Sequence, residues 1–236
     1  MKYKNWKQIW NKNAKTIKPK NLKDLIKLNG HSSATSEIKE KDWKKYTNYF
    51  TKKYNFKQNH SILEIGCGSG AFLYFFFKKK IQCFGIDNSA NLIKIAKKFF
   101  KKENFHTGEA NNLSKIKNKK IDFIFANSVF QYFKNLKYAT QVLDEMVRIS
   151  HSETRIIILD VPDKNKYKLW KKSAIKKIGI SEFKKNYKNL KHKFYDKSFF
   201  YNYALSKKLN ISILNQKLIK KENSKFRFNI FLNKKK

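Results

Sequence analysis

Residues 62–72 combine an apolar run with a cluster of glycines, and this pattern could hold a nucleoside. The apolar run leads into Gly66, Gly68 and Gly70, and a helical pattern follows. A glycine loop between a strand and a helix lets the backbone approach a ligand closely, because a Cβ atom there would collide with it. Asp87 ends the next apolar run, where a carboxylate can accept hydrogen bonds from both ribose hydroxyls. The sequence therefore predicts a site for a nucleoside cofactor.

Two classes of cofactor fit this loop. Gly66, Gly68 and Ala71 satisfy the dinucleotide fingerprint G-x-G-x-x-G/A, and the spacing to Asp87 suits it as well. Glu64 favours a different ligand, because an acid at a strand end can face a cationic group or its bound water. The remaining length also counts against a dehydrogenase. Only about 75 residues follow the fifth predicted strand, which is little for a separate substrate domain.

The elements around the loop alternate between strands and helices, which indicates a parallel sheet with helices on both faces. The predicted strands are 61–65, 82–86, 104–107, 121–126 and 155–161, and the predicted helices are 70–79, 89–102 and 136–149. Two further strand-like runs, 211–218 and 226–232, flank a turn at 222–224. They predict a hairpin that closes one edge of the sheet.

The N-terminal part of the chain is predicted to be mainly helical, with a polar loop at 30–36. We expect residues 1–59 to form a helical lid packed on a core domain that comprises residues 60–236. The aromatic residues of the lid could line the site, although rings at helical spacing more often pack against a sheet. These rings are Trp6, Trp10, Trp43 and Tyr46.

The net charge of the chain is +38, but its composition favours general lysine enrichment as the cause, without a dedicated acidic partner. Only three of the 55 basic residues are arginine, the lysines are spread along the chain, and residues with AT-rich codons abound. We therefore expect solvated surface lysines, and a nucleic-acid partner is possible but not favoured. The positive electrostatic field of the chain could still attract an acidic or phosphorylated substrate. Two cysteines, no signal-like start and no membrane-length apolar run predict a reduced cytoplasmic protein.

Four motifs, in order, resemble those of class I S-adenosylmethionine-dependent methyltransferases. Residues 64–70 match the family's first motif, E/D-x-G-x-G-x-G. Residues 85–89 resemble its second-strand motif, and residues 108–113 resemble the loop after its third strand. Residues 121–130 resemble its fourth-strand motif, which ends beside the methionine moiety of the cofactor.

This resemblance implies an α/β fold with a Rossmann-like, seven-stranded, mostly parallel sheet, helices on both faces and an antiparallel last strand. It implies S-adenosyl-L-methionine as cofactor, with Asp87 on the ribose and Glu109 near the adenine amino group. The cofactor-binding residues that it implies are Glu64, Gly66, Cys67, Gly68, Gly70, Asp87, Asn88, Glu109, Ala110 and Asn127. No metal site is predicted.

Methyl transfer mainly requires the protein to align the acceptor with the sulfur–carbon bond and to exclude water. A general base is needed only where the acceptor must lose a proton early. Among the residues that could assist are His192, His31 and Tyr132.

We therefore predict methyl transfer to an oxygen or nitrogen of a small molecule, with a sugar or cell-surface glycan precursor as one candidate. Residues 127–130 lack the Asn/Asp-Pro-Pro-aromatic pattern that resembles base methylation. The alternatives are an RNA methyltransferase that uses the basic surface, a non-catalytic S-adenosylmethionine-binding protein and, more remotely, a dehydrogenase.

Overall fold

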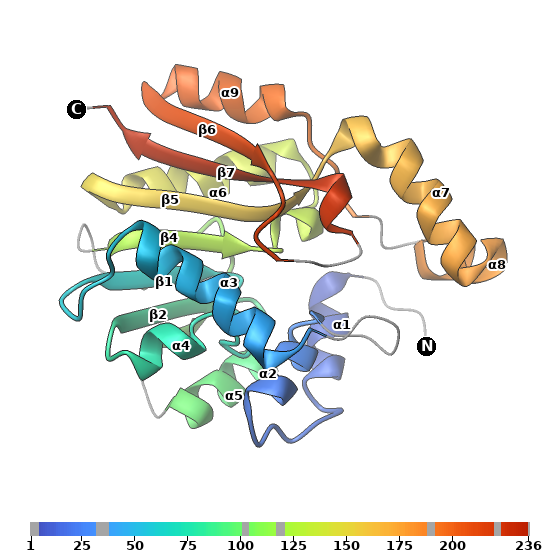
Figure 1. Cartoon of the computed structure of the whole chain (residues 1–236), viewed down its shortest axis with the longest axis horizontal. Coiled ribbons are helices and arrows are strands. Elements are labelled where there is room, and N and C mark those ends of the chain that lie inside the picture. The colour runs from blue at the N-terminus through green and yellow to red at the C-terminus, as the bar shows by residue number, and fades with distance from the viewer. Residues whose placement is uncertain are drawn as a thin grey trace.

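The computed structural model describes residues 5–31, 38–100, 104–116, 121–187, 192–219 and 223–235. A seven-stranded sheet with the order β3-β2-β1-β4-β5-β7-β6 forms its centre (Figure 1). The strands are β1 (Ser61–Ile65), β2 (Gln82–Asp87), β3 (Phe105–Thr107), β4 (Ile121–Asn127), β5 (Ser150–Pro162), β6 (Leu209–Asn215) and β7 (Arg227–Lys234). Strands β1 to β5 pair in parallel, whereas β7 runs antiparallel to both β5 and β6. The predicted fold class is confirmed.

Helices cover both faces of this sheet. Those before and between the first strands are α1 (Trp6–Asn13), α2 (Leu22–Leu28), α3 (Glu40–Lys53), α4 (Tyr74–Lys78) and α5 (Ala90–Phe100). The later ones are α6 (Leu136–Arg148), α7 (Tyr167–Ile178), α8 (Ile180–Tyr187) and α9 (Lys197–Ser206), with short 3-10 turns η1 (Phe130–Tyr132), η2 (Lys164–Lys166) and η3 (Ser224–Phe226). No helix in the described ranges has the length and apolar character that crossing a bilayer requires.

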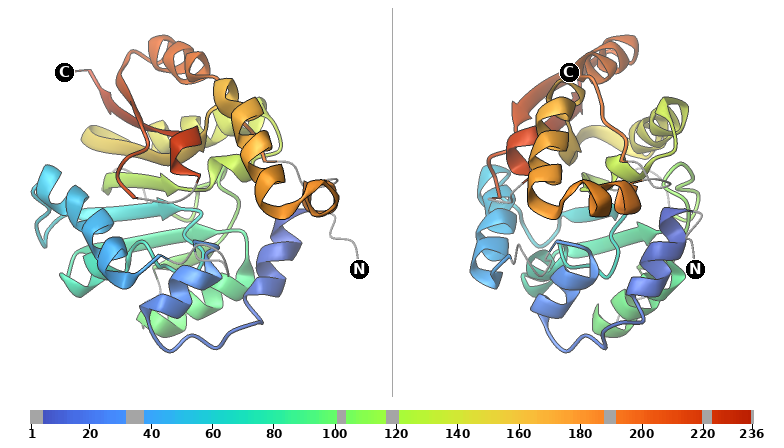
Figure 2. Two further views of the ribbon diagram at one scale, coloured as in Figure 1. Left: turned by 45° about the vertical axis from the view of Figure 1, so that its right-hand side comes forward. Right: turned by 90° about the vertical axis from the view of Figure 1, so that its right-hand side faces the viewer.

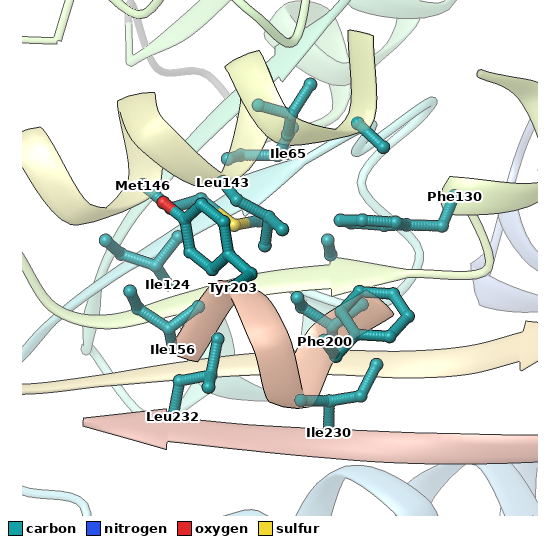
Figure 3. Packing of buried hydrophobic residues seen from close by; sticks show 14 of the residues in the cluster. Ile65, Ile124, Phe130, Leu143, Met146, Ile156, Phe200, Tyr203, Ile230 and Leu232 are labelled. Atoms are coloured by element: carbon teal, nitrogen blue, oxygen red, sulfur yellow. The ribbon is translucent and has the colours of Figure 1, made fainter. Parts of the chain in front are cut away.

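The apolar runs of the central strands supply both layers of the core, because successive side chains of a strand point to opposite faces. On β4, Ile124 packs with α6 and α9, whereas its neighbours Phe123 and Phe125 pack with α3 and α4. Figure 3 shows the first layer, where Leu143 of α6 and Phe200 of α9 meet the sheet. Parallel strands buried on both faces require continuous apolar runs of this kind.

The structure departs from the predicted elements in three places. Helix α4 begins later than predicted because Gly70 has φ +85°, which lies outside the helical region. Strand β5 begins earlier, at Ser150, which pairs with Ile121 across a register shift. Helices α7, α8 and α9 were not predicted, and Figures 1 and 2 show α7 and α8 projecting beside one end of the sheet.

The predicted hairpin at the sheet edge is present as β6 and β7. Residues 32–36 of the predicted loop and Glu222 of the predicted turn lie outside the described residues.

The N-terminal helices pack on the core by different amounts. Helix α3 buries Trp43, Tyr46 and Phe50 against the face of the sheet that carries Phe125. Helix α1 has no buried residue in its described span, and it attaches to α5 through hydrogen bonds that Asn11 accepts. The segment therefore combines a firmly packed helix with one that lies on the surface.

Candidate active site

A cavity of about 1480 Å³ opens where β1, β2 and β4 end at their carboxyl edges. Open α/β sheets bind their ligands at this edge, where the strand order reverses. The cavity is larger than the roughly 300–1,000 Å³ of an ordinary small-molecule pocket. Its size is sufficient for a cofactor and a second molecule.

The glycine loop brings the backbone to the wall of this cavity. Gly66 and Gly68 have φ values of +72° and +54°, in the left-handed region that favours glycine. A Cβ atom on Gly66 would lie 2.4 Å from Cγ2 of Val129, so no side chain fits there without displacing its neighbour. Both glycines line the cavity.

Asn29, at the end of α2, holds the glycine loop from the outside. Its Oδ1 accepts a hydrogen bond of 2.8 Å from the backbone N–H of Ser69, and its Nδ2 donates one of 3.0 Å to the carbonyl of Cys67. Asn29 also lines the cavity. The sequence contains no local signal for this contact, because Asn29 lies 38 residues before Cys67.

Asp87 closes the same loop from β2. Its Oδ2 accepts from the backbone N–H of Gly68 at 2.9 Å, and its Oδ1 accepts from that of Ser89 at 2.8 Å. Burial raises the pKa of Asp87, and the two backbone hydrogen bonds oppose that rise. A carboxylate offers about four acceptor sites, so Asp87 keeps capacity for hydroxyl groups of a ligand in the cavity that it lines.

Glu64 and Asn127 place an unpartnered acceptor beside an unpartnered donor. Within the described residues, the buried Oε2 of Glu64 and the buried Nδ2 of Asn127 have no hydrogen-bond partner. Glu64 is paired in register with Phe125, so Asn127 points to the same face two residues farther along β4. Each such buried atom costs about 1–3 kcal/mol when it stays unsatisfied. A ligand that carries a cation and an acceptor oxygen would satisfy both atoms.

Neighbouring groups control the ionisation of Glu64 and the orientation of Asn127. Burial raises the pKa of Glu64, and the charge of Asp87 raises it further. The hydroxyl of Tyr46 donates a hydrogen bond of 3.0 Å to Oδ1 of Asn127, which leaves Nδ2 to face the ligand. Burial, followed by the charges of Asp160 and Glu64, raises the pKa of Tyr46, so the hydroxyl remains a donor.

The loop after β3 supplies the other end of the predicted cofactor site. Glu109 accepts a hydrogen bond of 2.9 Å from the hydroxyl of Tyr138, and both residues line the cavity. Asn88 and Ala110 line it as well. Of the ten residues implied for the cofactor, eight line the cavity. These eight are Glu64, Gly66, Gly68, Asp87, Asn88, Glu109, Ala110 and Asn127.

Cys67 and Gly70, the other two, lie behind the wall. The thiol of Cys67 is fully buried near Gly85, and this burial raises its pKa. A Cβ atom on Gly70 would lie 2.5 Å from the ring of Phe100, so this glycine allows α5 to pack closely.

His192 and Tyr132 lie together at the other end of the cavity. Trp6 of α1 stacks on His192 with ring centroids 5.1 Å apart, and its ring lies 4.8 Å from that of Tyr132. Burial, together with the charge of Arg227, lowers the pKa of His192 to about 3. His192 is therefore neutral near pH 7. His31 also lines the cavity, but its ring contacts Trp43, 4.7 Å away.

A buried polar network fixes the strand ends under this part of the cavity. Ser128 and Asp160 both have left-handed backbones, with φ of +57° and +63°. The hydroxyl of Ser128 donates to Oδ2 of Asp160 at 2.5 Å. Arg227 of β7 pairs with that carboxylate and donates hydrogen bonds to the carbonyl of Asp160 and to Gln131. Among the described residues, no cluster could hold a metal ion.

Sequence reasoning missed most of the residues at this end of the cavity. They lie mainly on or near α7 and α8, which were not predicted: Lys164, Tyr167, Trp170, Lys171, Phe183, Lys184, Lys193 and Phe194. The spacing of Trp170, Ala174 and Ile178 is helical and is the signal that could have found α7.

Comparison with known proteins identifies the fold and the domain. A protein family described as "Methyltransferase domain" matches residues 63–158. The beauvericin nonribosomal cyclodepsipeptide synthetase of Beauveria bassiana is 30% identical over 96 residues, which are 37% of this chain. This chain covers only 3% of the length of that synthetase.

Two solved structures share the fold at low identity. A magnesium protoporphyrin IX methyltransferase from Synechocystis, with bound S-adenosylhomocysteine (SAH), is 13% identical, with a TM-score of 0.61 over 99% of this chain and 97% of that chain. An S-adenosylmethionine-dependent methyltransferase from Clostridium acetobutylicum is also 13% identical, with a TM-score of 0.61 over 84% of this chain and 93% of that chain.

The predicted cofactor fits the site and is supported by these matches. S-adenosylmethionine ends in an ammonium and a carboxylate, which complement Glu64 and Asn127, and its ribose hydroxyls suit Asp87. The family match and the relative with bound SAH confirm this prediction. Residues 63–158 of the chain therefore match a methyltransferase domain family, and the chain shares its fold with S-adenosylmethionine-dependent methyltransferases of known structure.

Proposed function

We propose that the protein transfers a methyl group from S-adenosylmethionine to an oxygen or nitrogen of a small molecule. The observation that carries this proposal is the buried pair of unpartnered atoms, Glu64 Oε2 and Asn127 Nδ2, at the end of the glycine loop. When bound, the cofactor supplies a methyl group on a positively charged sulfur, already activated for displacement. Glu64, Asp87, Glu109 and Asn127 hold the cofactor in this proposal.

The chain's own contribution is orientation and the exclusion of water. We assign the lid role to residues 1–59, because α1 lies between the two ends of the cavity. Trp6 reaches His192 and Tyr132, while Asn11 accepts hydrogen bonds from the side chain of Ser89 and the backbone of Asn91 on the cofactor side. A helix without buried residues can leave the core at low cost, which allows ligands to enter and leave.

His192 and Tyr132 line the acceptor end in this proposal. A conjugate acid with a pKa of about 3 makes His192 a weak base, so it serves as a neutral hydrogen-bonding group that orients the acceptor. His31, beside Trp43, is assigned to the wall near the glycine loop. Rate enhancement then comes chiefly from alignment of the acceptor with the methyl group.

A small acceptor suits the cavity, which accommodates a second molecule beyond the cofactor. The Synechocystis relative is named for a small-molecule substrate, magnesium protoporphyrin IX. A sugar or glycan precursor remains one candidate acceptor. The RNA alternative rests on the overall charge of +38 alone, so no second function is proposed.

The test is transfer from methyl-labelled S-adenosylmethionine to two fractions of the source cells, low-molecular-weight metabolites and RNA. We expect protein-dependent label in the metabolite fraction and its loss in the Glu64→Gln variant. Label in the RNA fraction alone would replace the small-molecule proposal with the RNA alternative. No label in either fraction, with cofactor binding intact, would support a non-catalytic binding protein.

A further inference from the structure

Charged side chains are sorted along the cavity. The three acids in its lining, Glu64, Asp87 and Glu109, all lie at the cofactor end, on or after β1, β2 and β3. The other charged side chains of the lining are all lysines. Four of them come from η2, α7, α8 and the segment before α9, and these are Lys164, Lys171, Lys184 and Lys193. The remaining two are Lys7 and Lys134, and Lys134 lies beside Tyr138, the hydrogen-bond partner of Glu109.

Two of these lysines have a partner of their own. Lys164 pairs with Asp196 at 2.8 Å, and the ammonium of Lys134 lies 5.3 Å from the ring centroid of Tyr138. Lys171, Lys184 and Lys193 form no ion pair with the residues that the structure describes. They come from α7, from α8 and from the segment before α9, so three separate parts of the chain bring them to one cavity.

Three acids on the elements around this end are already engaged. Asp160 pairs with Arg227, Asp163 lies 4.0 Å from Lys197, and Asp196 is the partner of Lys164. None of these three acids belongs to the cavity lining. Lys171, Lys184 and Lys193 therefore have no acidic partner among the residues that the structure describes.

Aromatic rings form the wall beside the free lysines. Trp170 and Phe183 are buried, with ring centroids 5.9 Å apart. Phe194 lies 5.0 Å from Trp170 and 5.0 Å from Tyr167. Figure 2 shows α7 and α8 at the same end of the sheet as α1, which carries Trp6. An apolar surface next to unpaired cations is a complementary site for a molecule with an apolar body and an anionic group.

We propose that the methyl acceptor is a small organic anion with a planar apolar body. Its carboxylate or phosphate group is held by Lys171, Lys184 and Lys193, and its body packs on Trp170 and Phe194. This inference rests on the proposed methyl transfer. The lysine-rich composition alone does not explain this arrangement, because the acids of the cavity lining lie apart from Lys171, Lys184 and Lys193.

The test compares two fluorescent probes on the SAH-loaded protein. The probes are 1-anilinonaphthalene-8-sulfonate, which is anionic, and N-phenyl-1-naphthylamine, which has the same rings without the sulfonate. We expect one anionic probe to bind per chain, about tenfold more tightly than the neutral probe, with an affinity that added salt weakens. Equal affinity for the two probes overturns the proposal.

Two double variants locate the binding site. We expect Lys171→Gln with Lys184→Gln to reduce the affinity for the anionic probe to that for the neutral one. The control, Lys41→Gln with Lys45→Gln on the exposed side of α3, removes the same charge and leaves the affinity unchanged. An equal loss in both double variants shows nonspecific attraction by net charge and overturns the proposal.

Displacement of the anionic probe identifies the acidic group. Displacement by benzoate indicates a carboxylate, displacement by phenyl phosphate indicates a phosphate, and benzyl alcohol is expected to displace neither. Displacement by benzyl alcohol as readily as by the anions contradicts the lysine site. SAH affinity is measured in every variant. Failure of the wild-type protein to bind SAH would count against the proposed function instead of the acceptor class.

Discussion

The hydroxyl of Tyr46 donates a 3.0 Å hydrogen bond to Oδ1 of Asn127, and this bond connects α3 to the end of β4. Both residues are buried. An amide has a donor end and an acceptor end, so a donor on Oδ1 determines that Nδ2 faces the ligand. A helix of the N-terminal segment thus orients a predicted cofactor-binding residue that it does not itself contain.

Replacing Tyr46 with phenylalanine should weaken cofactor binding. The change leaves Oδ1 of Asn127 without this donor, and the amide can then turn its other end toward the cofactor. We expect the dissociation constant for S-adenosylmethionine to rise about 3- to 10-fold and the free energy of unfolding to fall by about 1–3 kcal/mol. Calorimetric titration and urea unfolding measure the two effects. Tyr49→Phe, on the same helix, is the matched control, and an equal effect there would contradict the role of Tyr46.

The affinity for S-adenosylmethionine should rise with pH. Burial and the charge of Asp87 raise the pKa of Glu64 in the free protein. A bound cation lowers that pKa, because it stabilises the carboxylate. Binding therefore releases a proton at pH values between the free and bound pKa values, and affinity levels off above the free value.

Titrations from about pH 5 to about pH 8 in buffers with different ionisation enthalpies should detect this proton release. In Glu64→Gln the release should disappear and the affinity should be low throughout. A fall in the affinity for S-adenosylmethionine with rising pH would contradict this prediction.

Ser128 should tolerate glycine better than alanine. Its φ of +57° is unfavourable for any residue with a Cβ atom, by about 1–2 kcal/mol. Ser128→Ala loses the hydrogen bond to Asp160 and keeps the strain, whereas Ser128→Gly loses the bond and relieves the strain. We expect the glycine variant to be more stable by about 1–2 kcal/mol in urea unfolding. The opposite order would show that the left-handed backbone carries no strain.

The buried ion pair between Arg227 and Asp160 should matter more than an exposed one. Arg227→Met leaves a buried carboxylate without its cation, at an expected cost of about 3–5 kcal/mol in the free energy of unfolding. The double variant Arg227→Met with Asp160→Asn should recover much of that loss. Arg148→Met breaks a surface pair with Glu145 and should cost at most about 1 kcal/mol.

The same arginine should also affect His192. Its charge helps to lower the pKa of that imidazole, so the pKa should rise in Arg227→Met. Titration of the His192 ring by nuclear magnetic resonance measures the shift. An unchanged pKa would show that burial alone keeps the ring neutral.

The sequence predicts those parts of the fold and the site that depend on local pattern. Strands β1 and β2 follow from their apolar runs, and Gly66, Gly68 and Asp87 follow from the loops that end them. Contacts between distant segments leave no such pattern. Asn29 reaches the glycine loop across 38 residues, and Arg227 reaches Gln131 across 96.

The sequence did not predict the lysine-rich end of the cavity, for a related reason. Helices α7 and α8 carry many lysines and few buried residues, so their apolar periodicity is weak. Trp170 is the one buried residue of α7. Residues of α7 and α8 line the same cavity as Trp6 of α1, and that arrangement depends on tertiary packing.

The glycine loop, Glu64 and Asp87 are expected to bind S-adenosylmethionine. Calorimetric titration of the purified protein tests it most directly. We predict saturable binding of one S-adenosylmethionine per chain and at least about tenfold weaker binding in Glu64→Gln and in Asp87→Asn. Asp144→Asn, a half-buried control on α6 outside the cavity lining, should bind normally. Absence of saturable binding, or equal affinity in all four proteins, would contradict the account.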